Sequence, residues 1–105
     1  MNIIGFKKEF GRPGQNYLGT LEQGEEDFPK LEKIVRKTPS HAVVVFDIRR
    51  LDLFGYSYSK QTIRRLLQMA KANILDDRFF LVQCSNQKEA GELSGALAQL
   101  KMAML

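Results

Sequence analysis

The sequence predicts an α/β fold, in which a mixed β-sheet with an N-terminal hairpin packs against helices around a parallel central βαβ unit. Two apolar runs, residues 42–48 and 78–84, are rich in β-branched and aromatic residues, as strands covered on both faces are. The amphipathic segment between them, residues 59–75, completes a strand–helix–strand unit, and a right-handed crossover makes its strands parallel. With 105 residues, the chain can bury one core, so we expect a single domain, either complete or the N-terminal part of a longer protein.

The hairpin is predicted from the N-terminal segment. Residues 3–10 and 16–23 are expected to be its strands, joined by a turn over residues 12–15. Pro13 presets φ at the second position of that turn and Gly14 accepts the positive φ of the third, which is the type II pattern.

Three helices are predicted from apolar residues at helical spacing. The first covers residues 28–38, after an acidic stretch and before Pro39, and its apolar face consists of Phe28, Leu31, Ile34 and Val35. The second covers residues 59–75, with an apolar stripe of Ile63, Leu66, Leu67, Ala70 and Ile74. The third begins at Asn86, which is spaced from Glu89 as in a capping box. Residues 101–105 are then either a short final strand or the point at which a longer protein was cut.

The composition argues against catalysis. The chain has one His, one Cys and no Trp, which leaves too few residues for a metal site or an activated nucleophile. Nucleotide-binding loops need several glycines directly after a strand, whereas the turn after residues 42–48 contains only Gly55. We therefore expect no enzymatic activity, no metal and no cofactor. Cys84 closes an apolar stretch, so we expect a buried, reduced thiol there.

A small-ligand site has two sequence candidates. Asp47 ends the predicted central strand, where open α/β sheets place their ligands, although its carboxylate can equally bond the adjacent loop. Ser85 and Asn86 stand at the predicted start of the third helix and are the other candidates. No apolar run reaches the ~18 residues of a membrane span, and the N-terminus lacks the features of a secretory signal. The expected location is therefore cytoplasmic, without membrane contact.

The positive charge is concentrated in one segment. Residues 49–71 contain six cationic side chains and one carboxylate, whereas residues 1–48 are balanced. Four polar residues of this segment follow one flank of the second predicted helix: Lys60, Arg64, Gln68 and Lys71. Phe54, Tyr56 and Tyr58 lie in the same segment, and basic residues mixed with aromatic ones are typical of single-strand nucleic-acid grooves. Binding of nucleic acid or another anionic ligand by residues 49–71 is therefore one functional hypothesis.

The loop that leads into the second helix supports another hypothesis. Ser57 or Ser59 can cap that helix, and a hydroxyl at a helix N-terminus is a position where added phosphate is stabilised. Tyr56 and Tyr58 offer aromatic contact area, unless both pack inward and one serine serves only as a cap. The residues expected to contact a partner are Gly55, Tyr56, Ser57, Tyr58, Ser59, Lys60 and Arg64.

The order of elements, together with VVVFDIRRLDLFGYSYSKQTIRRLL at residues 43–67, resembles the STAS fold of anti-sigma factor antagonists and sulphate-transporter tails. In this resemblance, Asp47 matches the Asp that closes a strand, Leu51 and Leu53 match a hydrophobic link, and Ser57 matches the serine that is phosphorylated in antagonists. This chain has Gly55, Tyr56 and Tyr58 where antagonists usually have Asp, Ser and Gly around that serine, which puts phosphorylation of Ser57 in doubt.

The resemblance implies a STAS-like sandwich that works as a regulatory, non-enzymatic module. Such a module would dock another protein, for example a regulatory kinase or an anti-sigma-like factor, through the serine loop and the helix after it. A homodimer is a further option. The sequence thus favours regulatory protein binding, with nucleic-acid or anionic-ligand binding as the alternative.

Overall fold

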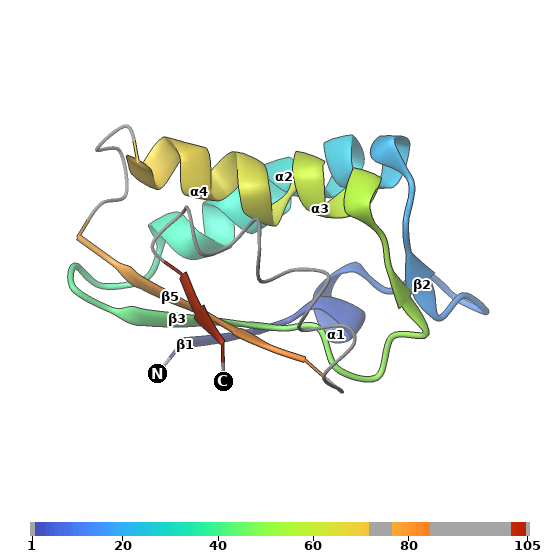
Figure 1. Ribbon diagram of the computed structural model, residues 1–105, viewed down its shortest axis with the longest axis horizontal. Helices are drawn as coiled ribbons and strands as arrows, with labels where there is room; N and C mark the ends of the chain where they lie inside the picture. Colours follow the sequence, from blue (N-terminus) through green and yellow to red (C-terminus); the bar gives the residue numbers. More distant parts are fainter. Residues whose placement is uncertain (1, 72–76, 85–101, 105) are drawn as a thin grey trace.

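A parallel four-stranded sheet forms the base of the protein in the computed structural model, which describes residues 2–71, 77–84 and 102–104 (Figure 1). Its strands are β1 (Asn2–Gly5), β3 (Val43–Asp47), β5 (Phe79–Gln83) and β6 (Met102–Met104), in the order β1-β3-β5-β6. Every neighbouring pair is parallel, and Val45 is aligned with Leu81 between β3 and β5. The predicted parallel central unit is therefore confirmed, and so is the short final strand.

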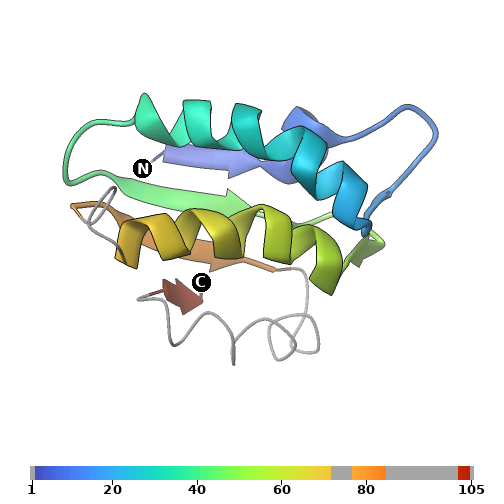
Figure 2. The ribbon, with the colours of Figure 1, turned by 90° about the horizontal axis from the view of Figure 1, so that it is seen from above.

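The longer helices of the described residues lie on one face of this sheet. They are α2 (Leu21–Arg36), α3 (Tyr56–Gln61) and α4 (Ile63–Lys71), and the view from above shows α2 and α4 running side by side over the strands (Figure 2). The strand order does not reverse in the described sheet. Successive right-handed crossovers in one direction place their helices on the same side, which explains the two-layer arrangement. Within the described residues, no helix is long and apolar enough to cross a membrane.

The prediction of an N-terminal hairpin is wrong, and so is the prediction of a mixed sheet, because every described strand pair is parallel. β1 is a parallel edge strand beside β3, and residues after it form the short helix α1 (Phe6–Phe10). Phe6 and Phe10 are both buried, and a spacing of four residues suits one face of a strand as well as one face of a helix. The predicted turn does exist, since Gly14 has a φ of 73° and the Gln15 N–H donates to the Arg12 carbonyl over 3.0 Å. It does not join two strands of the sheet.

A second, smaller sheet includes part of the segment that was predicted to be the second hairpin strand. β2 (Tyr17–Leu18) pairs in parallel with β4 (Leu53–Phe54), a strand inside the segment predicted to be a loop. The two strands form a separate ribbon at one end of the molecule, at the right in Figure 1. We call this pair the β2–β4 ribbon.

The first long helix begins at Leu21, seven residues before the predicted start at residue 28. Thr20 is its N-cap: the Thr20 Oγ1 accepts from the Gln23 N–H over 3.1 Å, and the Gln23 Oε1 accepts from the Thr20 N–H over 3.1 Å. This capping box satisfies two backbone donors that a helix start otherwise leaves open. Pro29 lies inside the helix and lacks an N–H for the helical ladder, and the helix continues past it to Arg36.

The second long helix is two helices. It was predicted over residues 59–75, but α3 begins at Tyr56, and the backbone breaks at Thr62, where φ is −118° and ψ is −92°. The Thr62 hydroxyl donates to the Tyr58 carbonyl over 2.9 Å at this break. The predicted apolar stripe is confirmed for its described part, because Ile63, Leu66 and Leu67 are all fully buried. The side chains of Ala70 and Ile74, and the third predicted helix from Asn86, lie outside the described residues.

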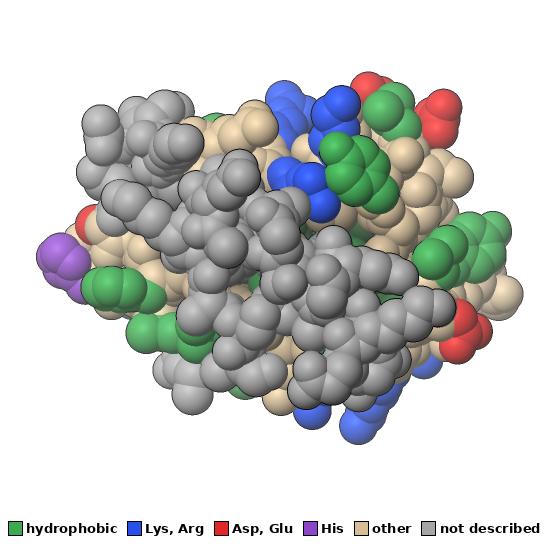
Figure 3. All heavy atoms as spheres, viewed as in Figure 1, with side chains coloured by type: hydrophobic (Ala, Val, Ile, Leu, Met, Phe, Trp, Pro, Cys, Tyr) green, Lys and Arg blue, Asp and Glu red, His purple; other side chains and the backbone are tan. Residues whose placement is uncertain are grey.

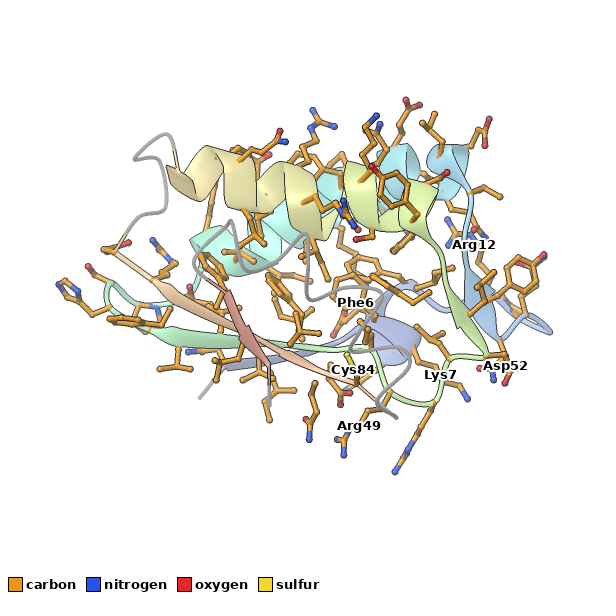
Figure 4. All side chains as sticks on the ribbon, in the orientation of Figure 1. Phe6, Lys7, Arg12, Arg49, Asp52 and Cys84 are labelled. Atoms are coloured by element: carbon orange, nitrogen blue, oxygen red, sulfur yellow. The ribbon has the colours of Figure 1, made fainter. Side chains whose placement is uncertain are left out.

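An aromatic cluster centred on Phe6 joins the two layers. The Phe6 ring centroid lies 5.1 Å from that of Phe10, 6.0 Å from that of Phe46 and 5.4 Å from that of Phe54. Phe6 and Phe46 are fully buried. Figure 4 shows Phe6 between the sheet and the helices.

Gly24 is the point of closest approach between α2 and α3. A Cβ added there would lie 2.7 Å from the Gln61 Cβ and 3.0 Å from the Tyr58 carbonyl oxygen. In an exposed helix, Ala is about 1 kcal/mol more favourable than Gly. Here we expect the opposite: Gly24→Ala should lower the free energy of unfolding by about 1–3 kcal/mol, because the two helices must move apart. Urea unfolding measures the change.

The neighbouring exposed position provides the control for this prediction. Glu25→Ala changes the same turn of α2 without facing α3, so its effect should stay within about 0.5 kcal/mol. A Gly24→Ala variant that is more stable than the wild type would contradict the close packing of α2 and α3.

Candidate functional site

The serine loop lies where the β2–β4 ribbon meets α3. Gly55 is the N-cap of α3, and its N–H donates to the Leu18 carbonyl over 2.8 Å. A Cβ at Gly55 would lie 2.9 Å from the Gly19 Cα, so two glycines let the loop pack directly on the chain beside β2. No side chain caps α3. The predicted capping role of Ser57 or Ser59 is therefore wrong, because the helix starts one residue before Ser57.

Two of the predicted contact residues are buried. Tyr58 and Ser59 have no exposed surface, so neither can contact a partner in this fold. The Tyr58 hydroxyl donates to the Asp27 Oδ2 over 2.8 Å, and Asp27 also accepts from both terminal nitrogens of Arg12 at 3.1 Å. Burial, and then the hydrogen bond to Asp27, raise the pKa of Tyr58, so the phenol stays neutral. Tyr58 ties α3 to α2 instead of offering contact area.

The other loop residues remain accessible. Tyr56 is 64% exposed and Ser57 is exposed on the first turn of α3. The Arg64 guanidinium carbon lies 4.3 Å from the centre of the Tyr56 ring, which is a cation–π distance. Lys60 is exposed on the same helix, and Arg64 is half-buried. Two cationic side chains from consecutive helices therefore accompany the exposed ring.

Four large apolar side chains are exposed around the β2–β4 ribbon, and together they form what we call the ribbon-end patch. Tyr17 (41% exposed) and Leu53 (54%) are aligned with each other by the pairing of β2 with β4. Leu21 (39%) is the first residue of α2, which follows β2, and Tyr56 is the first residue of α3, which follows β4. Figure 3 shows hydrophobic side chains in separate groups at this end of the molecule, with other surface between them. Several large apolar side chains exposed at one end of a molecule are candidates for an interaction site.

A concave surface lies at the carboxyl ends of β1 and β3, apart from the ribbon-end patch. It is a cleft of about 300 Å³, which we call the basic cleft, and it is lined by Gly5, Lys7, Lys8, Asp47, Arg49 and Arg50. Gly5 and Asp47 are register partners, so the residues that follow the two strands lie beside each other. Figure 4 shows Lys7 and Arg49 on the side of the molecule away from α2 and α4.

Asp47 is held by the loop that follows its own strand. The Arg49 Nε donates to the Asp47 Oδ1 and the Arg49 Nη2 to the Oδ2, each over 3.0 Å, and the Arg49 N–H also donates to Oδ1 at 3.0 Å. These hydrogen bonds from Arg49 lower the pKa of Asp47. The carboxylate therefore stays charged at neutral pH, and the ion pair weakens only as the pH falls through this lowered pKa. Bonding to the adjacent loop, one of the two roles predicted for Asp47, is confirmed.

The cationic residues of the 49–71 segment do not form one surface. Arg49 and Arg50 line the basic cleft, whereas Lys60 and Arg64 belong to α3 and α4 above the sheet. Gln68 is exposed on α4, and the side chain of Lys71 lies outside the described residues. The fold thus brings Arg49 and Arg50 together with Lys7 and Lys8, which are remote in sequence.

The remaining candidates stand as follows. Ser85 and Asn86 lie outside the described residues, so their predicted ligand role stays a prediction. Cys84 is half-buried and packs against the core. In the part of the chain that the structure describes, no three His, Cys, Asp or Glu side chains are grouped as metal ligands are.

Comparison of the chain with protein-family models, curated proteins and solved structures finds no match. Three features of the chain bear on its function: the ribbon-end patch, the basic cleft and the motif at residues 43–67.

Proposed function

We propose that this chain is a non-enzymatic regulatory module that docks another protein through the ribbon-end patch and the first turn of α3. The observation that carries the proposal is the exposure of three large side chains, Tyr17, Leu53 and Tyr56, on the β2–β4 ribbon and on the helix that follows it, where Ser57 is exposed too. Tyrosines bring a large contact area at low entropic cost, and they are enriched at protein interfaces. The buried Tyr58 also holds α3 in place, because its hydroxyl donates to Asp27 of α2.

The charge beside the patch specifies the chemistry of the partner. Lys60 and Arg64 accompany Tyr56, and Arg64 is already held against its ring. A partner that presents an apolar surface bordered by carboxylates would complement these two cations. Because Ser57 is exposed next to Tyr56, a phosphate on Ser57 would pair with Lys60 and oppose the carboxylates of such a partner.

We further propose that the domain is of STAS-like type. The support is the strand that closes with Asp47, the link in which Leu51 is half-buried, and the serine on the first turn of the helix that follows. This type of domain would make a regulatory kinase or an anti-sigma-like factor the expected partner. The same surface would serve a homodimer if the partner were a second copy.

Two variants of the first turn of α3 test the docking surface. Tyr56→Ala removes the most exposed ring, and Ser57→Asp adds a negative charge at the position of a phosphate. We expect each variant to fold normally and to weaken binding of the partner about 30-fold, which corresponds to the loss of an interface hot spot. The measurement is affinity capture by the full chain with quantitative mass spectrometry, followed by calorimetry with the purified protein that is captured.

Phe79→Ala is the matched control, because Phe79 is 62% exposed but lies on β5, away from the ribbon. A true partner is lost with Tyr56→Ala and retained with Phe79→Ala. If binding survives both Tyr56→Ala and Ser57→Asp, docking at this surface is excluded. Size-exclusion chromatography of the purified chain at several concentrations separates a homodimer from a heterologous partner.

Nucleic-acid binding by residues 49–71 has weaker support, because the fold separates Arg49 and Arg50 from Lys60 and Arg64. A salt titration distinguishes the two functions. Nucleic-acid binding falls steeply with the logarithm of the salt concentration and tolerates many sequences, whereas docking through apolar side chains with two cations beside them depends less steeply on salt.

A further inference from the structure

The basic cleft lies apart from the ribbon-end patch, at the carboxyl ends of β1 and β3. Two elements distant in sequence build it: Gly5, Lys7 and Lys8 come from the end of β1 and from α1, while Asp47, Arg49 and Arg50 come from the end of β3. The parallel pairing of Gly5 with Asp47 fixes their relative position. The shape of the cleft is therefore set by the parallel pairing of β1 with β3.

The lining of the cleft is strongly positive. Among the described residues that line it, four carry cationic side chains and one carries a carboxylate, and that carboxylate is paired with Arg49 through two side-chain hydrogen bonds of 3.0 Å. The pair uses only one edge of the guanidinium. The Arg49 side chain is 46% exposed, so its other edge presents N–H donors at the surface.

Local structure keeps these cations in place. Phe6 and Phe10 are buried in the aromatic cluster, which turns the exposed Lys7 and Lys8 of the same short helix outward. Arg50 has a φ of 69°, a left-handed conformation that is unfavourable for residues other than glycine. Residues with such strained backbone conformations are often found at ligand-binding sites.

We infer that the basic cleft binds the phosphate group of a small phosphomonoester. Arginine matches phosphate geometry with its planar fork, and lysines add point charges that suit a dianion. A volume of about 300 Å³ is at the small end of ligand pockets, so it fits a phosphate and a small organic group. A nucleic-acid strand needs a longer track of cations, and Lys60 and Arg64 lie on α3 and α4, outside the cleft.

The test is an NMR titration of the ¹⁵N-labelled full chain at constant ionic strength. The probes are inorganic phosphate, adenosine monophosphate and, as the control without phosphate, adenosine. We expect saturable shifts for amides of residues 5–8 and 47–50 with both phosphate probes and none with adenosine. Tighter binding of the mononucleotide than of inorganic phosphate identifies a phosphomonoester, and equal binding identifies the phosphate group alone as the ligand.

Matched double variants separate a site from overall charge. Lys7→Gln with Lys8→Gln should weaken phosphate binding by about tenfold or more. Lys33→Gln with Lys37→Gln removes the same charge from exposed positions on and next to the last turn of α2, and should change binding by less than about twofold. Arg49→Lys keeps the charge and loses the fork, so it should also weaken binding.

Equal weakening by the two double variants would overturn the inference, since it would show only an effect of net charge. Shifts that do not saturate, or that spread over the surface, would overturn it as well. Tighter binding of duplex DNA than of the mononucleotide, with a steep salt dependence, would replace it by nucleic-acid binding. Tyr56→Ala should leave phosphate binding unchanged, so this result is independent of the proposed docking function.

Discussion

Replacement of Phe6 by alanine is expected to lower the free energy of unfolding by about 3–5 kcal/mol, the usual cost of truncating a buried aromatic residue. Phe6 is fully buried, and its ring contacts rings from α1, β3, β4 and α3. The cavity would therefore open where four elements meet, and none of them can close it alone. Domains of this size are stable by only about 5–15 kcal/mol, so a large part of the stability would be lost.

The measurement for Phe6→Ala is chemical unfolding followed by circular dichroism. Phe79→Ala serves as the control, because Phe79 is 62% exposed and its truncation should cost far less. Phe6→Leu keeps part of the volume and should fall between the two. A loss below about 1 kcal/mol for Phe6→Ala would contradict the central position of this ring.

Leu67→Ala has the second large expected effect, a loss of about 2–5 kcal/mol in the free energy of unfolding. Leu67 is fully buried on the face of α4 that packs on the sheet, beside Ile63 and Leu66. Together with these two neighbours, Leu67 packs α4 into the hydrophobic core of the strand–helix–strand unit. The loss should also appear as reduced protection of β3 and β5 amides in hydrogen exchange.

Leu53→Ala is the matched control, since the same side chain is removed from a position that is 54% exposed. It should cost well below the loss at Leu67, because less apolar surface is returned to water. If the two leucine variants were equally stable, α4 would not pack on the sheet as described.

The central part of the fold could be predicted because its residues have few alternatives. Residues 43–46 and 79–82 are uninterrupted apolar runs rich in β-branched and aromatic residues, and the stripe of Ile63, Leu66 and Leu67 follows helical spacing. Their short length and their β-branched and aromatic residues favour strands in the two runs, and the spacing of the stripe favours a helix. The parallel pairing then follows from the helix that connects the two strands.

The N-terminal segment was mispredicted because its pattern fits two structures. Phe6 and Phe10 are four residues apart, which places them on one side of a strand or of a helix. The parallel pairing of β1 with β3 decides between them, and that pairing is a tertiary contact. The early start of α2 was different, since Thr20 and Gln23 have capping-box spacing, a signal that sequence reasoning missed.

The candidate sites show the same limit. The sequence identified the exposed Tyr56 and Ser57 but could not show that Tyr58 turns inward, because its partners Asp27 and Arg12 come from another part of the chain. The positive charge of residues 49–71 indicated two of the cations that line the basic cleft, Arg49 and Arg50. Lys7 and Lys8 join it only through the register of β1 against β3, which no local pattern encodes.

The order of the strands also has a consequence for how the protein is made. β3 pairs with β1, β5 with β3 and β6 with β5, so each strand joins the edge left by the main-sheet strand before it. No strand of the described sheet has to enter between two that are already paired. The sheet can therefore grow in one direction as the ribosome releases the chain, with each newly added edge serving as the template for the next strand.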